Sequence, residues 1–370
     1  MATKEEHIVI VGAGIFGLSA AIILAEEGYR VTVLEKNVDI MQEASLVNQN
    51  RIHMGYHYPR SLTTGKEALE GLPSFKQYYG SCINDGFNKY YGIASNGSYL
   101  SAQEFETFCE TLKIPLVEEW PADELLNKGL IEKCWKVPEP AFDYYQLRSE
   151  VTEKISSLKN IRIFRNTSIQ QADYVSDVHH LRLNNGYKIQ CNSVVNASYS
   201  GLSEVLKTLN IPVMKAHYEL LVLPIIKLPK SIPPFGVTIM DGPFCSIVPK
   251  GFSEGEYILS HVSHSVVQSH LGYEKPEWNT IDGNIEKDII DFCRAYYPIL
   301  SKATLKDSWI TTKMVLPNQD IDDARPTLVI QHERNVYSLF SGKVTTCISA
   351  AQNLLSIINT KFNHENSFLG

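Results

Sequence analysis

The sequence has no closely spaced pair of cysteines, although it contains seven of them. They are scattered from Cys82 to Cys347, and none has the Cys-x-x-Cys spacing of zinc or redox sites. An odd, scattered set does not supply a disulfide framework either. The sequence therefore predicts no metal site and a reduced protein, located in the cytoplasm.

The chain also lacks an excess of positive charge. It has 34 Lys and Arg residues against 41 Asp and Glu residues, a net charge of −7 over 370 residues. Proteins that bind nucleic acid usually carry a basic stripe, so we expect no nucleic-acid partner. The length exceeds that of most single domains and predicts two lobes.

An uninterrupted membrane-spanning run is missing as well. Residues 8–25 are almost continuously apolar and long enough to cross a bilayer, but Gly12, Gly14 and Gly17 interrupt them. The residues before this stretch do not form a positively charged leader. We interpret it as a buried strand followed by a helix, and we expect no membrane span.

These glycines follow a short apolar run, residues 7–11, that is typical of a strand buried on both faces. Gly12 permits a tight turn, Gly14 lets the backbone approach a pyrophosphate, and Gly17 lets the next helix pack closely on the strand. The helix is predicted over residues 18–27. The spacing indicates a dinucleotide-binding turn.

An acidic residue completes the nucleotide pattern. Gly28 stands where a helix cap is expected, residues 29–34 are predicted as a second strand, and Glu35 ends it. A carboxylate at this point accepts hydrogen bonds from ribose hydroxyls and repels a 2′-phosphate. The pattern favours NAD or FAD over NADP.

Two separated segments carry a family resemblance. Residues 12–21 and 31–36 resemble the opening of the FAD-dependent D-amino-acid oxidase superfamily, which includes glycine oxidase, 2-hydroxyglutarate oxidase and flavin glycerol-3-phosphate dehydrogenase. Residues 193–198 resemble its second strand and turn beside the adenosine, although Ser198 replaces the usual glycine. The resemblance implies FAD as the cofactor.

The resemblance also implies an α/β fold in two parts. We expect a discontinuous, Rossmann-like FAD-binding domain and a substrate domain with a mainly antiparallel β-sheet. The expected order is FAD-binding domain 1–80, substrate domain 81–150, FAD-binding domain 151–215, substrate domain 216–320 and FAD-binding domain 321–370. The last helix is predicted over residues 345–360.

Residues 48–61 are unusually rich in His, Tyr and Arg. Residues 52–55, Ile-His-Met-Gly, are similar to a family motif that runs beside the flavin ring. Position 57 departs from the relatives, so His57 is predicted as a substrate-side donor or base. Three interpretations of His53 stay open: a hydrogen bond near the flavin, a covalent link to its 8α-methyl group, or a packed structural histidine.

The C-terminal segments carry the other candidates. Arg325-Pro326 and residues 342–346 resemble the Arg-Pro and Gly-Gly-Lys-x-Thr-Thr elements of glycerol-3-phosphate dehydrogenase. Arg325 is predicted to grip a substrate carboxylate, with an ion pair to Asp322 or Asp323 as the alternative. The helix start after Thr345 offers backbone N–H groups to the flavin, and Lys343 adds charge unless it is simply solvated.

The candidate site residues fall into two groups. The predicted catalytic residues are His57, His53, Arg325 and Lys343. The predicted FAD-binding residues are Gly12, Gly14, Ile15, Phe16, Gly17, Glu35, Lys36, Asn50, Arg51, Ile52, His53, Ala197, Gly342, Lys343, Val344 and Thr345.

These features predict an FAD-dependent oxidoreductase that transfers hydride from a C–H bearing OH or NH to flavin N5. The substrate is expected to be small and anionic, and the motif likenesses favour the hydroxyl. The alternatives are an amino-acid or secondary-amine oxidase, a non-catalytic flavin-binding subunit, and an NAD-linked enzyme without flavin. The electron acceptor, O₂ or a quinone or another carrier, stays open.

Overall fold

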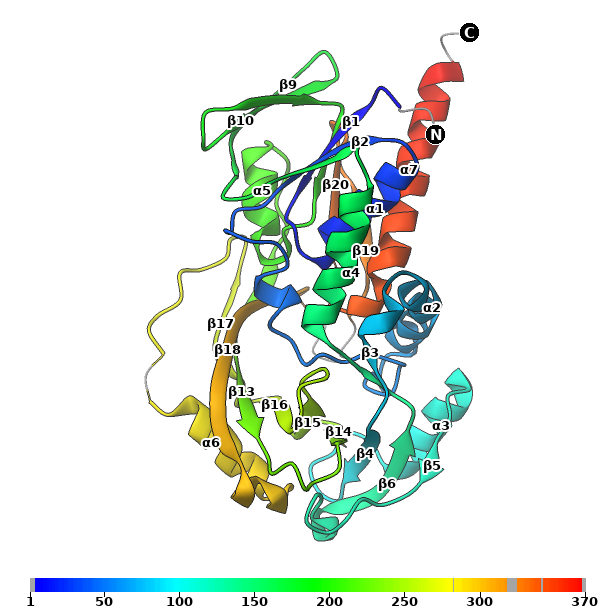
Figure 1. Cartoon of the computed structure of the whole chain (residues 1–370), viewed down its shortest axis with the longest axis vertical. Helices are drawn as coiled ribbons and strands as arrows, with labels where there is room; N and C mark the ends of the chain where they lie inside the picture. Colours follow the sequence, from blue (N-terminus) through cyan, green and yellow to red (C-terminus); the bar gives the residue numbers. More distant parts are fainter. Residues whose placement is uncertain (1–3, 282, 318–324, 341, 368–370) are drawn as a thin grey trace.

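The computed structural model describes residues 4–281, 283–317, 325–340 and 342–367. Its first layer is a six-stranded sheet, in the upper half of Figure 1. Neighbouring strands are parallel except β19, which is antiparallel to β20. The order is β19 (Leu328–Gln331), β20 (Val336–Phe340), β12 (Ser193–Asn196), β1 (His7–Val11), β2 (Arg30–Leu34) and β8 (Ile161–Phe164).

Both faces of this sheet are covered, which explains why β1 is buried at every residue. One face packs against four helices, and the other packs against a small antiparallel sheet and a short helix. The four helices are α1 (Ile15–Glu26), α2 (Leu62–Tyr79), α4 (Tyr144–Ser157) and α7 (Cys347–Ser367); the opposite cover is β9 (Ile169–Val175), β10 (Val178–Leu183), β11 (Lys188–Cys191) and α5 (Leu202–Thr208).

The second layer is a nine-stranded sheet in the lower half of Figure 1, here called the covering sheet. Its pairs are antiparallel except β14 with β4. Helix α6 (Ile285–Arg294) packs on one part of it and α3 (Ala102–Leu112) on another. The strands are β17 (Val266–Gly272), β13 (Ala216–Lys227), β16 (Glu256–His261), β15 (Cys245–Pro249), β14 (Phe235–Met240), β4 (Asn88–Ala94), β6 (Ile131–Val137) and β5 (Val117–Glu118), with β18 (Thr304–Val315) paired to β13.

The chain alternates between the two layers. The first sheet takes strands from residues 7–34, 161–196 and 328–340, and the covering sheet takes them from 88–137 and 216–315. The predicted α/β fold with a mainly antiparallel second sheet is therefore confirmed. A third, two-stranded sheet joins β3 (Ile83–Asn84) to β7 (Ala141–Phe142).

Two expectations need correction, and one strand was missed. The predicted domain boundary at residue 150 falls inside α4, whose residues Leu147 and Val151 pack in the core of the first layer. The last helix begins at Cys347 and continues to Ser367, beyond the predicted end. Strand β18 was not predicted, because its first four residues are exposed and break the apolar pattern.

None of the helices in the described part of the chain is both long and apolar enough to cross a membrane.

Candidate active site

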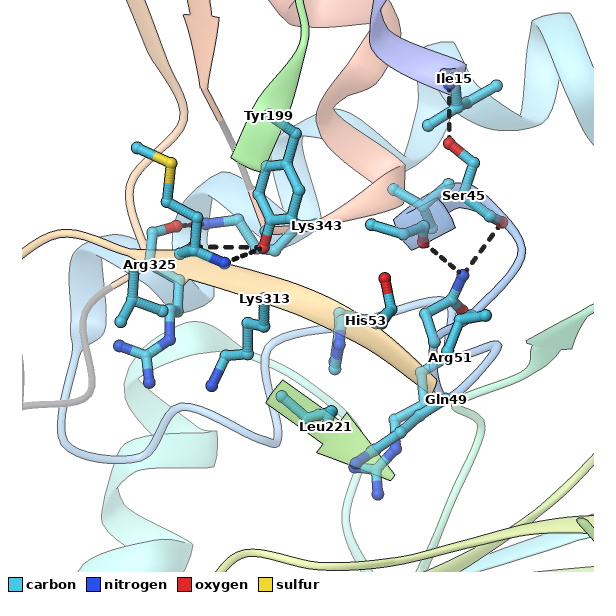
Figure 2. A pocket seen from close by; sticks show the side chains of 18 of the residues that line it. Ile15, Ser45, Gln49, Arg51, His53, Tyr199, Leu221, Lys313, Arg325 and Lys343 are labelled. Carbon is cyan, nitrogen blue, oxygen red and sulfur yellow. Dashed lines mark hydrogen bonds between the residues drawn. The ribbon is translucent and has the colours of Figure 1, made fainter. Parts of the chain in front are cut away.

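The two layers enclose a cavity of about 370 Å³. Figure 2 shows its labelled residues: Ile15 and Ser45 lie near the glycine turn, Arg325 lies on the opposite side, and Lys313 and Leu221 belong to the covering sheet. The cavity thus has one wall from the glycine turn and the C-terminal turn, and one wall from β13, β16 and β18. Residues 44–58 run between these walls.

The glycine turn is shaped by close backbone contacts. A Cβ atom on Gly12 would lie 2.7 Å from the carbonyl oxygen of Ala197, and one on Gly17 would lie 2.0 Å from the Gly12 oxygen. Gly14 lines the cavity and is the N-cap of α1, and a Cβ atom there would meet only Ser45 Oγ, at 3.1 Å. The positive end of α1 therefore meets the cavity at a residue without a side chain, which fits a pyrophosphate.

Glu35 supports this turn from behind. Its Oε2 accepts a 2.8 Å hydrogen bond from the Ala13 N–H, its Oε1 accepts one of 2.8 Å from the Asn37 N–H, and the residue is 6% exposed. Glu35 does not line the cavity. Each carboxylate oxygen keeps acceptor capacity, and the expectation that it also binds a ribose stays a prediction.

The His-rich segment places unpartnered donors against the cavity. Arg51 is 3% exposed, and its Nη1 donates to Nδ1 of His57 over 3.2 Å. Its Nε and Nη2, and Nδ1 of His53, are buried without a hydrogen-bond partner among the described residues. Buried polar groups are normally satisfied, so these atoms point to a missing polar ligand such as FAD. They also argue against His53 as a packed histidine satisfied at that nitrogen.

The two histidines of this segment are held neutral. Their rings stack with centroids 5.6 Å apart. Burial lowers the pKa of both His53 and His57 well below the ordinary value, and the Arg51 charge acts in the same direction. Because guanidinium cannot accept a hydrogen bond, Nδ1 of His57 must be the acceptor, and its proton sits on Nε2.

On the opposite side, Lys343 is fully buried rather than solvated, so that alternative is wrong. Its Nζ donates to Glu67 Oε2 over 3.0 Å and to the backbone oxygen of Arg325. Burial lowers the pKa of Lys343, and the Glu67 carboxylate opposes that effect. Asp322 and Asp323, the alternative partners of Arg325, lie outside the described residues.

Helix α2 fixes the turn before α7 by close approach. A Cβ atom on Gly71 would lie 2.7 Å from the backbone oxygen of Thr345. The Thr64 hydroxyl accepts from the Arg325 N–H over 3.1 Å, and Glu67 accepts from the Thr327 N–H over 3.0 Å. One helix face therefore positions Arg325, Lys343 and the start of α7 together.

Among the described residues, the covering sheet contributes two titratable side chains to the lining, Lys313 and His261. Lys313 Nζ donates to Glu219 Oε2 over 2.8 Å, across the β18–β13 pair. Nδ1 of His261 accepts from the N–H groups of Ser263 and His264, both at 3.3 Å. Burial lowers the pKa of His261 to about 4, so the ring is a neutral donor through Nε2.

The charged residues of the lining have one sign. None of the described residues that line the cavity is Asp or Glu, and four are basic: Arg51, Lys313, Arg325 and Lys343. Two of these basic side chains form ion pairs with carboxylates that do not line the cavity, Lys313 with Glu219 and Lys343 with Glu67. Such a site favours an anionic ligand.

The structure brings most predicted residues to this cavity. The predicted residues in the lining are Gly14, Ile15, Phe16, Arg51, His53, His57, Ala197, Arg325, Gly342, Lys343 and Val344. The predicted residues outside the lining are Gly12, Gly17, Glu35, Lys36, Asn50, Ile52 and Thr345. Sequence reasoning missed Glu67 and Lys313. Residues 311–315, Thr-Thr-Lys-Met-Val, show no apolar alternation, so the sequence carried no signal that would have placed Lys313.

The glycine turn, the adjoining Ala197 and the cation-lined cavity are typical of a dinucleotide-binding enzyme. Residues 7–342 match the family of FAD-dependent oxidoreductases of the D-amino-acid oxidase (DAO) type. The chain belongs to this family; it is an enzyme, and FAD is its cofactor. The NAD-linked and non-catalytic alternatives are thereby set aside.

Similar proteins agree with this assignment. The FAD-dependent monooxygenase kojA of Aspergillus flavus is 24% identical over 377 residues, covering 95% of this chain and 85% of that protein. The FAD-dependent monooxygenase FPY4 of Fusarium mangiferae is 22% identical over 365 residues, covering 95% and 90%. Both are similar over nearly their full length.

Two solved structures share the fold. Glycine oxidase from Geobacillus kaustophilus superposes with a TM-score of 0.72 at 16% identity, covering 95% of this chain and 94% of that one. L-proline dehydrogenase from P. horikoshii superposes with a TM-score of 0.71 at 16% identity, covering 98% and 95%. At these identities the likeness establishes the shared fold.

Proposed function

We propose that this enzyme oxidises the C–H bond next to a hydroxyl group in a small carboxylate substrate. The observation that carries the proposal is the lining of the cavity, which has four basic residues and no carboxylate among the described residues. A substrate carboxylate is attracted to such a site, whereas an ammonium group has no anionic partner in the lining. The hydroxyl is therefore favoured over a protonated amine.

The residues divide the work of binding and proton transfer. FAD, when bound, supplies the hydride acceptor. Arg325 binds the substrate carboxylate bidentately, which fixes the position of the reacting C–H bond. His57 and His261 donate from Nε2 to substrate oxygens, since Nδ1 of each ring already accepts.

His53 removes the proton from the substrate hydroxyl group. Its ring is neutral and lines the cavity, and its Nδ1 has no hydrogen-bond partner among the described residues. A neutral imidazole next to the substrate accepts a proton as hydride leaves. Arg51 and Lys343, each close enough to lower the pKa of His53, favour the return of that proton after the reaction.

A second candidate function is oxidation of an amino acid or secondary amine. It is favoured by the fold, since glycine oxidase and L-proline dehydrogenase are among the similar structures. In this cavity the amine would have to bind in its neutral form, because the lining lacks an acidic partner. The rate would then rise with pH toward the pKa of the free amine.

One experiment distinguishes oxidation of a hydroxy acid from oxidation of an amine. FAD-loaded enzyme is mixed anaerobically with hydroxy acids and amino acids of matched carbon skeleton, such as lactate with alanine and glycolate with glycine, and loss of the flavin absorbance is followed. We expect the hydroxy acid of a pair to reduce the flavin faster at neutral pH. Faster reduction by the amino acids would replace the first function with the second.

A further inference from the structure

A second concave surface shares no lining residue with the cavity. It is a groove of about 1570 Å³ at the N-terminal ends of β1 and β2, where His7 and Arg30 begin their strands. The glycine turn follows the opposite end of β1, after Val11. In Figure 1 this region lies at the top of the molecule, beside β9 and β10. We call it the basic groove.

The charge of the groove opposes that of the whole chain. Six Lys or Arg residues and only two acidic residues, Glu5 and Asp173, line it, although the net charge of the chain is −7. Within the described ranges, Lys4 is the only one of these six residues that forms an ion pair, with Glu27 at 3.4 Å. The six are Lys4, Arg30, Lys159, Arg162, Arg182 and Lys188.

Two of these basic residues face each other across a strand pair, where their like charges repel. Arg182 and Lys188 are direct partners in the antiparallel β10–β11 pair, and both are exposed. Like charges directly opposite each other destabilise a sheet. Burial lowers the pKa of His7, a residue of the same groove, and the charges of Arg30 and Arg162 act in the same direction.

The groove is preformed and includes residues of an edge strand. His7 joins its walls, with Nδ1 2.8 Å from the Gln190 oxygen and Nε2 2.8 Å from Thr32 Oγ1. Strand β8 is an edge strand of the first sheet, and its residue Phe164 lines the groove. Exposed aromatic surface comes from Phe164, 36% exposed, and Tyr187, 69% exposed.

We propose that the basic groove binds an acidic, extended segment of a partner protein. Carboxylates of the segment would pair with Arg30, Arg162, Arg182 and Lys188, while its backbone would add to the edge of β8. The edge strand favours a polypeptide, since a nucleic acid has no backbone groups that extend a sheet. The acidic remainder of the chain also disfavours a polyanion longer than the groove.

The test uses FAD-loaded enzyme and fluorescence anisotropy. The probes are a short labelled peptide of alternating Glu and Val, a Lys and Val peptide of equal length, and an oligothymidylate. We expect the acidic peptide alone to bind well, and its affinity to fall with added salt. Lack of binding of the acidic peptide, or tighter binding of the oligothymidylate, would overturn the proposal.

Substitutions in the basic groove test whether the peptide binds there. Lys188→Glu places an acid opposite Arg182, so we expect a higher unfolding temperature together with weaker peptide binding. Adding Arg162→Glu should weaken binding at least about tenfold while flavin absorbance and flavin reduction stay unchanged. Lys275→Glu, at an exposed lysine outside the groove, is the matched control. Equal binding by the double variant and the control would contradict the proposed location.

Discussion

The two walls of the cavity recognise their ligands in different ways. In the first wall, the N-terminus of α1 meets the cavity at Gly14, which has no side chain, so backbone N–H groups are open to a ligand there. The covering sheet instead presents side chains, above all Lys313 and His261. Backbone recognition suits a cofactor shared by a whole family, and side-chain recognition allows each member its own substrate.

The largest expected effect comes from the backbone wall. Gly14→Val would add atoms where the turn meets the cavity, yet its Cβ meets only the movable Ser45 hydroxyl at 3.1 Å. We expect a folded protein whose FAD affinity falls more than about a hundredfold, which leaves it colourless after gel filtration. Gly80→Ala, at a glycine whose Cβ position is open, is the control. Full FAD content in Gly14→Val would show that this wall does not hold the pyrophosphate.

This wall was also the part that the sequence predicted best. A turn made of consecutive residues is encoded locally, so the spacing of Gly12, Gly14 and Gly17 was sufficient to place it. Strand β1 matches its predicted bounds for the same reason. Arg51, His53 and His57 were found because they stand within one short segment.

Contacts between distant segments could not be predicted in this way. Glu67 reaches Lys343 only because α2 packs on the turn before α7, 276 residues away in the chain. Lys313 faces the cavity through the pairing of β18 with β13, and β18 itself has no clear apolar alternation. Tertiary packing, which a single sequence does not display, decides such positions.

The second largest effect is expected at the substrate anchor. Arg325→Lys keeps the charge but loses the planar, two-point grip on a carboxylate. We expect the anaerobic rate of flavin reduction to fall about a hundredfold with FAD content unchanged. Rapid-mixing absorbance measures this, and Lys306→Arg, at an exposed lysine on β18 outside the lining, is the control. An unchanged rate would place the anchor on the covering wall, at Lys313.

A third effect concerns stability against pH. Because burial lowers the pKa of His53 and His57 in the folded protein, the unfolded chain binds more protons below the ordinary His pKa. The contribution of these two residues to stability is therefore fully present above the ordinary His pKa of about 6.5, and it is lost progressively as the pH falls below that value.

The double variant His53→Asn, His57→Asn should lose less stability than the wild type between pH 7 and pH 5. Urea unfolding at a fixed FAD concentration measures the difference. His270→Asn, at an exposed residue, controls for the loss of an imidazole. Identical pH dependence in the double variant and the wild type would mean that these two rings are not held neutral.

The smallest effect is expected at His261 on the covering wall. His261→Gln retains an N–H donor, whereas His261→Phe retains only the volume of the ring. We expect the reduction rate of the Phe variant to fall about tenfold and that of the Gln variant to fall less. Since the pKa of His261 is about 4, neither change should remove a limb of the pH–rate profile near neutrality. Equal losses in both variants would indicate a packing role.

The most direct test of the central claim compares a charged substrate with its neutral analogue. FAD-loaded enzyme is mixed anaerobically with a 2-hydroxy acid that reduces the flavin and, separately, with the amide of the same acid. The cation-lined cavity predicts rapid bleaching by the acid, and bleaching by the amide that is slower by about a hundredfold or more. Equal bleaching by the two compounds would contradict an anionic substrate held by Arg325.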